Sequence, residues 1–399
     1  MSTGNKIGIT TATIIGMNAM IGAGIFGIPV ALAANVGPAG IITTIFVAIA
    51  VWFMAISLAR VAALFPKEGS FYVYSKQWGG HHLGILTSTA YLVGLMIAMG
   101  LLTQMAGYNL QHYFPGMTAS SLGLITLVAL IILNLFGVVL SEIGQQILIC
   151  TTVFPLLASI IICFSKANFS NLIPFAPYGW LNVLKASKTV IFSFFGFECA
   201  ASLFAIVKDP HKNVPRALAY AIAIVSVLYI LFTAAIIVSI PLSTFTSATM
   251  PISQVLKIAF PTLTWPIEAI HLSVLSAIIG TIHSMMWSSS NLLVSLIKEL
   301  KSRTAQKLLQ EQIITPRISI LLVGLAIYIS FATLKNIDLF FSLTAIFIVF
   351  AYASSIITLL TIPKEWESGQ NLKTLIGLGT AITIFIFAVD NYPVFCNFL

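Results

Sequence analysis

Three glycines and a proline interrupt an apolar stretch near the N-terminus, where Gly22, Gly24 and Gly27 precede Pro29. Residues 7–59 contain no Lys, Arg, Asp or Glu, so this stretch is apolar enough to lie in a lipid bilayer. Glycine removes side-chain restraint and proline removes a backbone donor, so both weaken a helix. Unwound backbone at bilayer depth persists only where protein, water or a ligand satisfies its polar groups. We therefore predict a binding site at this break.

A second stretch has the same character. Gly196 precedes Glu198, which is the single charged residue in the run from Thr189 to Val207. A charged side chain at the centre of a bilayer costs about 2.5–3.5 kcal/mol on insertion scales, and such residues usually have a function. We predict a second helix break here, with Glu198 as the proton-sensitive or cation-sensing group. The alternative is a structural glutamate that accepts hydrogen bonds from exposed backbone.

The elements that position these residues are membrane spans, because 59% of the 399 residues are hydrophobic and only 8% are charged. A spanning helix needs about 20 apolar residues. Residues 1–399 are predicted to form a single all-α transmembrane domain with eleven spans. The expected spans are 8–34, 39–63, 83–111, 121–140, 145–164, 187–207, 217–240, 266–297, 317–334, 338–362 and 373–392.

No motif in the sequence indicates an enzyme. The sequence has no HExxH, P-loop or GxSxG motif and no CxxC pair among its four cysteines. We expect no catalytic residue, no cofactor and no metal site.

The basic residues predict the topology. If the N-terminus is cytoplasmic, the loops on the outer side carry only five of the 19 Lys and Arg residues, namely Lys166, Lys185, Lys188, Lys257 and Lys335. This distribution obeys the positive-inside rule. We predict an integral protein of the plasma membrane, or bacterial inner membrane, with a cytoplasmic N-terminus. The net charge of +8 then reflects loop asymmetry at a lipid surface, and no nucleic-acid partner is indicated.

The two breaks fall in corresponding places of two halves. The first and sixth predicted spans are each followed by four more, which gives repeats over about 8–165 and 187–362 and an additional helix over 373–392. An odd number of spans per half inserts the halves in opposite orientations, so the two breaks can meet at mid-membrane. Interrupted helices in matching positions are typical of transporters with inverted repeats and alternating access.

Three motifs, in this order and spacing, resemble the amino acid/polyamine/organocation (APC) superfamily, and the resemblance covers about residues 5–390. They are Ala-Met-Ile-Gly-Ala-Gly-Ile-Phe-Gly-Ile-Pro at 19–29, Pro-Lys-Glu-Gly-Ser-Phe-Tyr-Val-Tyr at 66–74, and Ser-Phe-Phe-Gly-Phe-Glu at 193–198 followed by Val-Lys-Asp-Pro-His-Lys-Asn-Val-Pro-Arg at 207–216. The basic amino acid and polyamine antiporters, such as the arginine/agmatine antiporter, are the most similar group.

This resemblance implies a LeuT-type fold of five plus five helices, with spans one and six broken at mid-membrane. Members commonly have twelve spans, so a predicted eleven bears on dimer packing, and a homodimer is left open. The resemblance also implies that the loop from Phe65 to Gly80 shapes an inner gate, where the alternative is an ordinary cytoplasmic loop.

The chemistry of the breaks suits an α-amino acid. A helix that restarts after Gly22 and Gly24 can hold a carboxylate at its N-terminus, and carbonyl groups at both breaks can accept from an ammonium group. The alternative is that small residues merely allow close helix packing. The resemblance implies backbone contacts at several of these positions. The predicted substrate-binding residues are Met20, Ile21, Gly22, Ala23, Gly24, Phe192, Phe195, Gly196 and Trp287.

Phe192 and Trp287 fall where the similar antiporters carry gating tryptophans. We expect Trp287 to contact substrate through stacking or a cation–π interaction, with core packing as the alternative. His283, one turn earlier, is a secondary candidate for proton relay, with a hydrogen bond to a neighbouring helix as the alternative.

The sequence therefore predicts a secondary active amino acid transporter, either an antiporter or a proton-coupled permease. Its substrates would be amino acids, with cationic amino acids or their amines as the expected group. One alternative is a sodium-coupled symporter on the same fold, in which carbonyls of the first span and hydroxyls of Ser288, Ser289 and Ser290 would hold Na⁺. A more distant alternative is a channel or receptor-like membrane protein without coupled transport.

Overall fold

The computed structural model describes residues 7–22, 24–65, 70–136, 142–198, 207–248, 250–300, 302–303, 306–307, 315–362 and 371–390. Three of the predictions above fall partly outside these residues. They concern Ala23 in the first break, positions 66–69 in the expected inner loop, and positions 199–206 in the second half of the sixth span.

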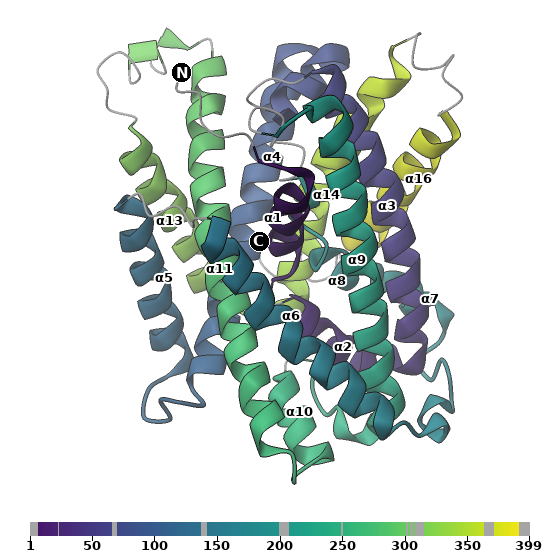
Figure 1. The fold of residues 1–399 in the computed structure, drawn as a ribbon. Helices are drawn as coiled ribbons and strands as arrows, with labels where there is room; N and C mark the ends of the chain where they lie inside the picture. Colours follow the sequence, from purple (N-terminus) through teal and green to yellow (C-terminus); the bar gives the residue numbers. More distant parts are fainter. Residues whose placement is uncertain are drawn as a thin grey trace.

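The described residues form helices joined by loops and turns, which confirms the prediction of an all-α protein (Figure 1). The longer helices are α1 (Ile9–Met20), α2 (Gly24–Asn35), α3 (Gly40–Leu64), α4 (Ser70–Leu110), α5 (Ala119–Leu135), α6 (Glu142–Ser165), α9 (Pro210–Ser239), α11 (Thr264–Glu299), α13 (Pro316–Thr333), α14 (Ile337–Leu360) and α16 (Asn371–Val389). The short helices are α7 (Trp180–Lys185), α8 (Ser187–Phe192), α10 (Ile252–Ala259) and the 3₁₀ turns η1 (Gly37–Ala39), η2 (Phe169–Leu172) and η4 (Leu242–Thr244).

Eight helices in the described part are long and apolar enough to cross a membrane. Helices α1 and α2 form a ninth span if the bent pair crosses together, with an angle of 44° between them. Helix α5 is apolar but shorter, and the chain after α8 is described only to Glu198. The protein is therefore an integral membrane protein, while the count of eleven spans stays a prediction.

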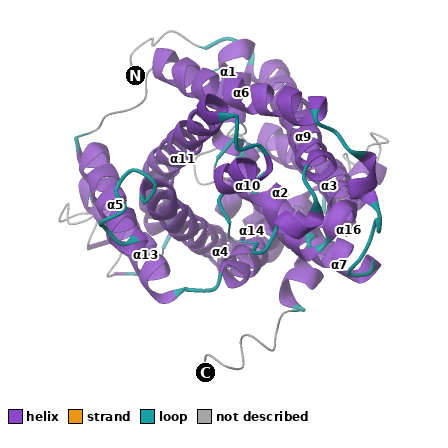
Figure 2. Ribbon diagram, turned by 90° about the horizontal axis from the view of Figure 1, so that it is seen from below, coloured by secondary structure: helices purple, strands orange, loops and turns teal. Residues whose placement is uncertain are grey.

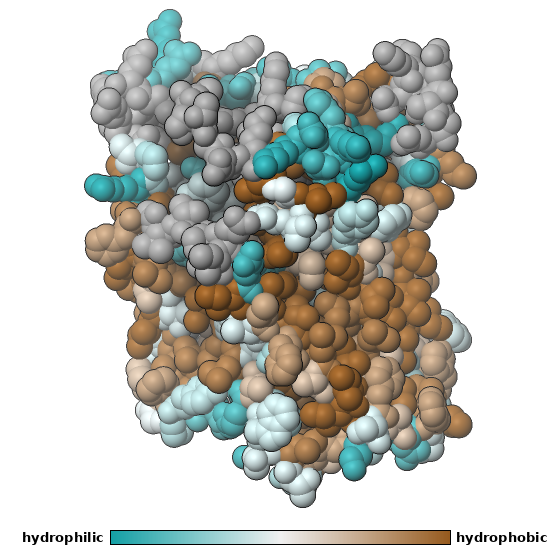
Figure 3. Space-filling view, in the orientation of Figure 1, coloured by the Kyte–Doolittle hydropathy of each residue, from teal (hydrophilic) through white to brown (hydrophobic). Residues whose placement is uncertain are grey.

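The broken span lies inside the bundle. Helix α1 packs against α9, α6 and α11, and α2 packs against α9 and α8. In the view along the bundle, α2 lies near the centre with α10, and α3, α4, α9, α11 and α14 lie around them (Figure 2). The space-filling view shows a broad hydrophobic surface, with the hydrophilic side chains gathered mainly toward its upper part (Figure 3). This surface suits contact with lipid tails.

The two ends of the bundle differ, and both are needed to describe the site. One end carries the start of α1, where the Lys208 amide donates to the Ile7 carbonyl at 3.0 Å. The other end carries the short helices α7 and α10, which lie low in Figure 1. We refer to these as the N-terminal end and the α10 end.

Candidate functional site

The first break separates α1 from α2 at the predicted position. Helix α1 ends at Met20, and Ile21 leaves helical geometry with φ −76° and ψ 77°. The Gly22 amide turns back to the Met20 carbonyl at 2.8 Å, and α2 begins at Gly24. All four of these residues are buried. The break therefore faces protein rather than lipid, as unwound backbone at this depth requires.

The second break follows α8. After Phe192 the chain makes a turn that leads to Gly196, which has φ 109°. A β-carbon at Gly196 would lie 2.2 Å from the carbonyl oxygen of Ala19, in the last turn of α1. Both the backbone angle and the contact require glycine here. Gly196 thus lets the turn after α8 approach the end of α1 closely.

The two breaks are in direct contact. A β-carbon at Gly24 would lie 3.0 Å from the Cα of Ser193, so the start of α2 touches the turn after α8. The buried hydroxyl of Tyr229, from α9, lies 2.9 Å from the Met20 carbonyl oxygen and 2.9 Å from that of Ser193. One hydroxyl proton is thus shared between the ends of α1 and α8. Tyr229 ties the two breaks into one unit.

Glu198 lies beside this unit in a buried hydrogen-bond network. Its Oε1 accepts from the hydroxyl of Tyr91 on α4 at 2.6 Å, and its Oε2 accepts from that of Tyr352 on α14 at 2.6 Å. The amide of Gly196 also donates to Oε2, at 3.0 Å. An ionised carboxylate accepts all three bonds without a donor of its own. The network connects α4 and α14 to the second break, three parts of the chain that are distant in sequence.

The start of α4 covers the same network. The ring of Phe71 lies 4.2 Å from the ring of Tyr91 and 6.0 Å from that of Tyr352, measured between centroids. The helix turns sharply at Gly80, where φ is 72°, so residues 70–79 run separately from the rest of α4. Part of the predicted loop over 65–80 is therefore a helical segment that packs an aromatic ring against the tyrosines that hold Glu198.

Another aromatic pair lies at α8, next to the breaks. The ring of Phe192 lies 5.1 Å from that of Phe341 on α14 and 6.2 Å from that of Phe195, in edge-to-face geometry. Such geometry is favourable for aromatic pairs. Phe341 also lines two cavities that lie beyond it toward the α10 end. The breaks therefore have an aromatic contact on this side and the Glu198 network on the other.

Two predicted site residues lie elsewhere. Trp287 is 48% exposed on α11, which the core-packing interpretation did not expect, and it does not line any of the cavities described for this part of the chain. His283 is buried, and the side-chain Nδ2 of Asn134 on α5 donates to its Nδ1 at 2.9 Å. The structure thus gives His283 the helix-to-helix hydrogen bond that was its alternative interpretation, and substrate contact by Trp287 stays a prediction.

The residues missed by the sequence analysis are tyrosines. Tyr91, Tyr229 and Tyr352 make the bonds that organise the site, yet they are three of 11 tyrosines with no motif around them. A weak signal was available, since each lies in a predicted span, where a buried hydroxyl needs a partner. That signal does not say which partner it is.

Comparison with known proteins gives the family. A family model described as amino acid permease matches residues 7–396. An uncharacterized transporter of Mycobacterium tuberculosis is 26% identical over 298 residues, which are 74% of this chain and 66% of the relative. A branched-chain amino acid permease of Bacillus subtilis is 25% identical over 274 residues, 64% of this chain and 59% of the relative. A methylthioribose transporter of Bacillus subtilis is 29% identical over 237 residues, 55% of this chain and 51% of the relative.

The chain spans about two thirds or less of the length of these relatives. The family and the relatives are permeases and transporters, in agreement with the prediction that the chain is not an enzyme. The resemblance to the APC superfamily rested on the motifs at 19–29, 66–74 and 193–216, and the family match covers all three. The chain therefore belongs to the amino acid permease family.

Proposed function

We propose that the protein is a secondary active transporter of amino acids that works by alternating access, in a plasma membrane with its N-terminus in the cytoplasm. The observation that carries this proposal is the contact between the two breaks, tied by Tyr229. The start of α2 at Gly24 provides helix N-terminal amides that can donate to a carboxylate. The carbonyl groups at the ends of α1 and α8 can accept from an ammonium group. A free amino acid carries both of these groups.

The surroundings of the breaks supply two gates. On one side the rings of Phe192 and Phe341 meet, and on the other the ring of Phe71 packs against Tyr91 and Tyr352. The first set joins α8 to α14, and the second set lies where Glu198 is joined to α4 and α14. Separation of one set while the other stays closed would open the breaks to one side of the membrane only, which is what alternating access requires.

Glu198 is proposed as the group through which protons affect the cycle. When ionised, it accepts both tyrosine hydroxyls and the Gly196 amide. A protonated carboxyl group has its own O–H, which must be donated to a neighbour. At least one tyrosine hydroxyl then has to rotate or move away. Protonation of Glu198 and the contact between α4 and α14 would thus be coupled.

The class of side chain follows from what faces the breaks. A cationic side chain, which the resemblance to basic amino acid antiporters favours, needs an acidic partner when it is desolvated. Glu198 is the acid beside the breaks in the described part, and a cation would compete with its three donors. Cationic substrates therefore require rearrangement of the Glu198 network, whereas a neutral amino acid does not. The choice between exchange and proton symport is left to the experiment below.

A sodium-coupled symporter is the second candidate, and one cavity favours it. A space of about 10 Å³ beside the first break is lined by Asn18, Ile21, Thr281 and Ser284, among others. A β-carbon at Gly22 would lie 3.0 Å from the Thr281 hydroxyl oxygen, so this hydroxyl lies at the break. Hydroxyl and carbonyl oxygens are suitable ligands for a hard cation. Of the hydroxyls that line this space, those of Thr281 and Ser284 lie one to two turns before Ser288–Ser290, the trio proposed from sequence, and that of Thr152 comes from α6.

The test is counterflow in proteoliposomes. Purified protein is reconstituted with an excess of an unlabelled amino acid inside, and uptake of radiolabelled amino acids and amines is followed with and without Na⁺ and across a pH gradient. A carrier accumulates label transiently, whereas a channel or receptor does not. Absence of counterflow for every amino acid would contradict the proposal, and a strict requirement for Na⁺ would favour the second candidate.

The same assay tests Glu198. The Glu198→Gln variant keeps the shape of the side chain but removes its charge, so we expect transport to lose its dependence on pH. The control is Glu268→Gln, because Glu268 is a half-exposed acid at the α10 end. If Glu198→Gln kept the wild-type rate and pH profile, the proposed role of this acid would be lost.

A further inference from the structure

A large cavity at the α10 end lies outside the site described above. Its volume is about 490 Å³, within the range of roughly 300–1,000 Å³ that is usual for small-molecule sites. It is lined by α2, α7, α8 and the start of α14, including Lys188, Asp338 and Phe341. We refer to it as the vestibule. Since Phe341 also contacts Phe192, the vestibule lies directly against the gate next to the breaks.

An ion pair between Lys188 and Asp338 lies at the wall of the vestibule, and its two members differ in exposure. Lys188 Nζ lies 3.0 Å from Asp338 Oδ2 and 3.1 Å from the Ser342 hydroxyl. The side chain of Lys188 is only 7% exposed, while that of Asp338 is 50% exposed. Lys188 lies in α8, which follows α7 directly through Ala186. Its buried ammonium group is therefore held by Asp338 and Ser342 of α14.

Asp338 is held in place by its own helix. It lies in the first turn of α14, where an acid is favourable, and the side chain of Asn336 accepts from the Asp338 amide at 2.8 Å and caps the helix. Lys188 and Asp338 are thus held on separate helices at the wall of one cavity, which Lys185, the partner of Asp390, also lines. A zwitterion that lies antiparallel to this pair would place its carboxylate at Lys188 and its ammonium group at the exposed side of Asp338.

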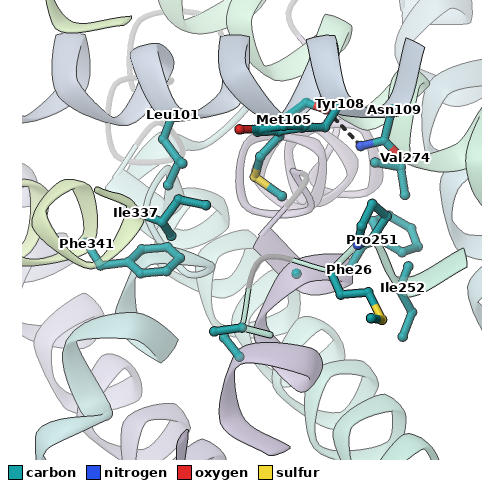
Figure 4. A pocket seen from close by; sticks show the side chains of 14 residues that line it. Phe26, Leu101, Met105, Tyr108, Asn109, Pro251, Ile252, Val274, Ile337 and Phe341 are labelled. Carbon is teal, nitrogen blue, oxygen red and sulfur yellow. Dashed lines mark hydrogen bonds between the residues drawn. The ribbon is translucent and has the colours of Figure 1, made fainter. Parts of the chain in front are cut away.

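A smaller cavity of about 50 Å³ adjoins the vestibule, and the two share Ala31, Ala248, Ile337 and Phe341. Figure 4 shows Leu101, Ile337 and Phe341 along one side of this smaller cavity and Val274, Pro251 and Ile252 along the other. None of its lining residues is charged. The side-chain Nδ2 of Asn109 donates to the Met105 carbonyl at 2.8 Å. A charged side chain that entered would lose water without gaining a partner, whereas an apolar one would be stabilised.

We propose that the vestibule is a binding site for a free α-amino acid with an apolar side chain, next to the breaks and distinct from them. Lys188 and Asp338 hold the carboxylate and the ammonium group, and the cavity lined by Leu101, Met105 and Val274 holds the side chain. The proposal rests on amino acid transport as the proposed function and adds the class of side chain. Binding there also adds contacts to both members of the ion pair between α8 and α14, the two helices that carry Phe192 and Phe341.

The test measures binding of radiolabelled leucine to the purified full chain, which does not require transport. In Lys188→Met and in Asp338→Asn we expect a binding component to weaken by at least tenfold. The matched control Lys257→Met removes an exposed lysine at the same end and should change binding by less than twofold. The exchange Lys188→Asp with Asp338→Lys should restore part of the binding, which a loss of folding would not allow.

Selectivity is tested at the side-chain cavity. Met105→Glu should weaken competition by leucine and strengthen competition by lysine, while the equally sized Met105→Gln should not admit lysine. Unchanged leucine binding in both ion-pair variants would overturn the proposal, as would stronger competition by lysine or arginine than by leucine in the wild-type protein. Counterflow is measured in parallel. Its absence alongside ion-pair-dependent leucine binding would refute the transport function and leave the vestibule site standing.

Discussion

The link between the two breaks gives the sharpest prediction, because a single hydroxyl makes it. In Tyr229→Phe the ring remains and can keep its contact with Phe194, whose ring centroid lies 5.0 Å away. Only the bond shared by the Met20 and Ser193 carbonyls is lost. Removing one partner from a buried polar group costs about 1–3 kcal/mol. Because the lost hydroxyl joins the ends of α1 and α8, its removal destabilises the arrangement of the two breaks that we propose binds substrate.

A change of about 1–3 kcal/mol corresponds to a factor of about 5–150 in an equilibrium constant. We therefore expect substrate affinity in Tyr229→Phe to fall by a factor in this range, measured by counterflow and by direct binding, together with a lower midpoint of thermal unfolding. The control is Tyr220→Phe, one of the exposed tyrosines on the same helix α9. Equal affinity and equal unfolding midpoints for both variants and the wild-type protein would show that the hydroxyl does not join the breaks functionally.

Two further predictions concern the second break and the Glu198 network. Gly196→Ala should abolish transport and lower the yield of monodisperse protein, because a β-carbon would lie 2.2 Å from a carbonyl oxygen of α1 and the φ angle of Gly196 is 109°. The control variant Gly379→Ala, which has open space around it, should behave as the wild-type protein in size-exclusion and uptake assays. Tyr352→Phe should shift the pH dependence of transport, because Glu198 loses one hydroxyl donor at 2.6 Å, whereas Tyr328→Phe, at an exposed position, should leave the pH profile as it is. A neutral Gly196→Ala would remove the steric argument for the close approach of the breaks, and a wild-type pH profile in Tyr352→Phe would separate the tyrosine from proton coupling.

The sequence by itself determined the class of protein and the places where its spans are interrupted. Glycine in an apolar run weakens a helix wherever it lies, so the end of α1 at Met20 and the turn at Gly196 were expected from local chemistry. Gly27 and Pro29 were expected to contribute to the first break, but both lie inside α2, which continues past them. The need of Glu198 for polar partners could also be predicted from the sequence, since it is one acid among apolar neighbours. The all-α architecture followed from the length and number of the apolar segments, and the family match agrees with it.

The tertiary structure decided which side chains meet at these places. Tyr91, Tyr229 and Tyr352 come from three helices that are far apart in the sequence, and their hydroxyls have partners only when those helices pack together. The direction of a side chain was also decided there, as Trp287 on the exposed face of α11 shows. In a membrane protein both the interior and the lipid-facing surface are apolar, so the sequence pattern does not reveal how a helix is rotated. Helix packing sets that rotation, and with it the residues that line the breaks and the vestibule.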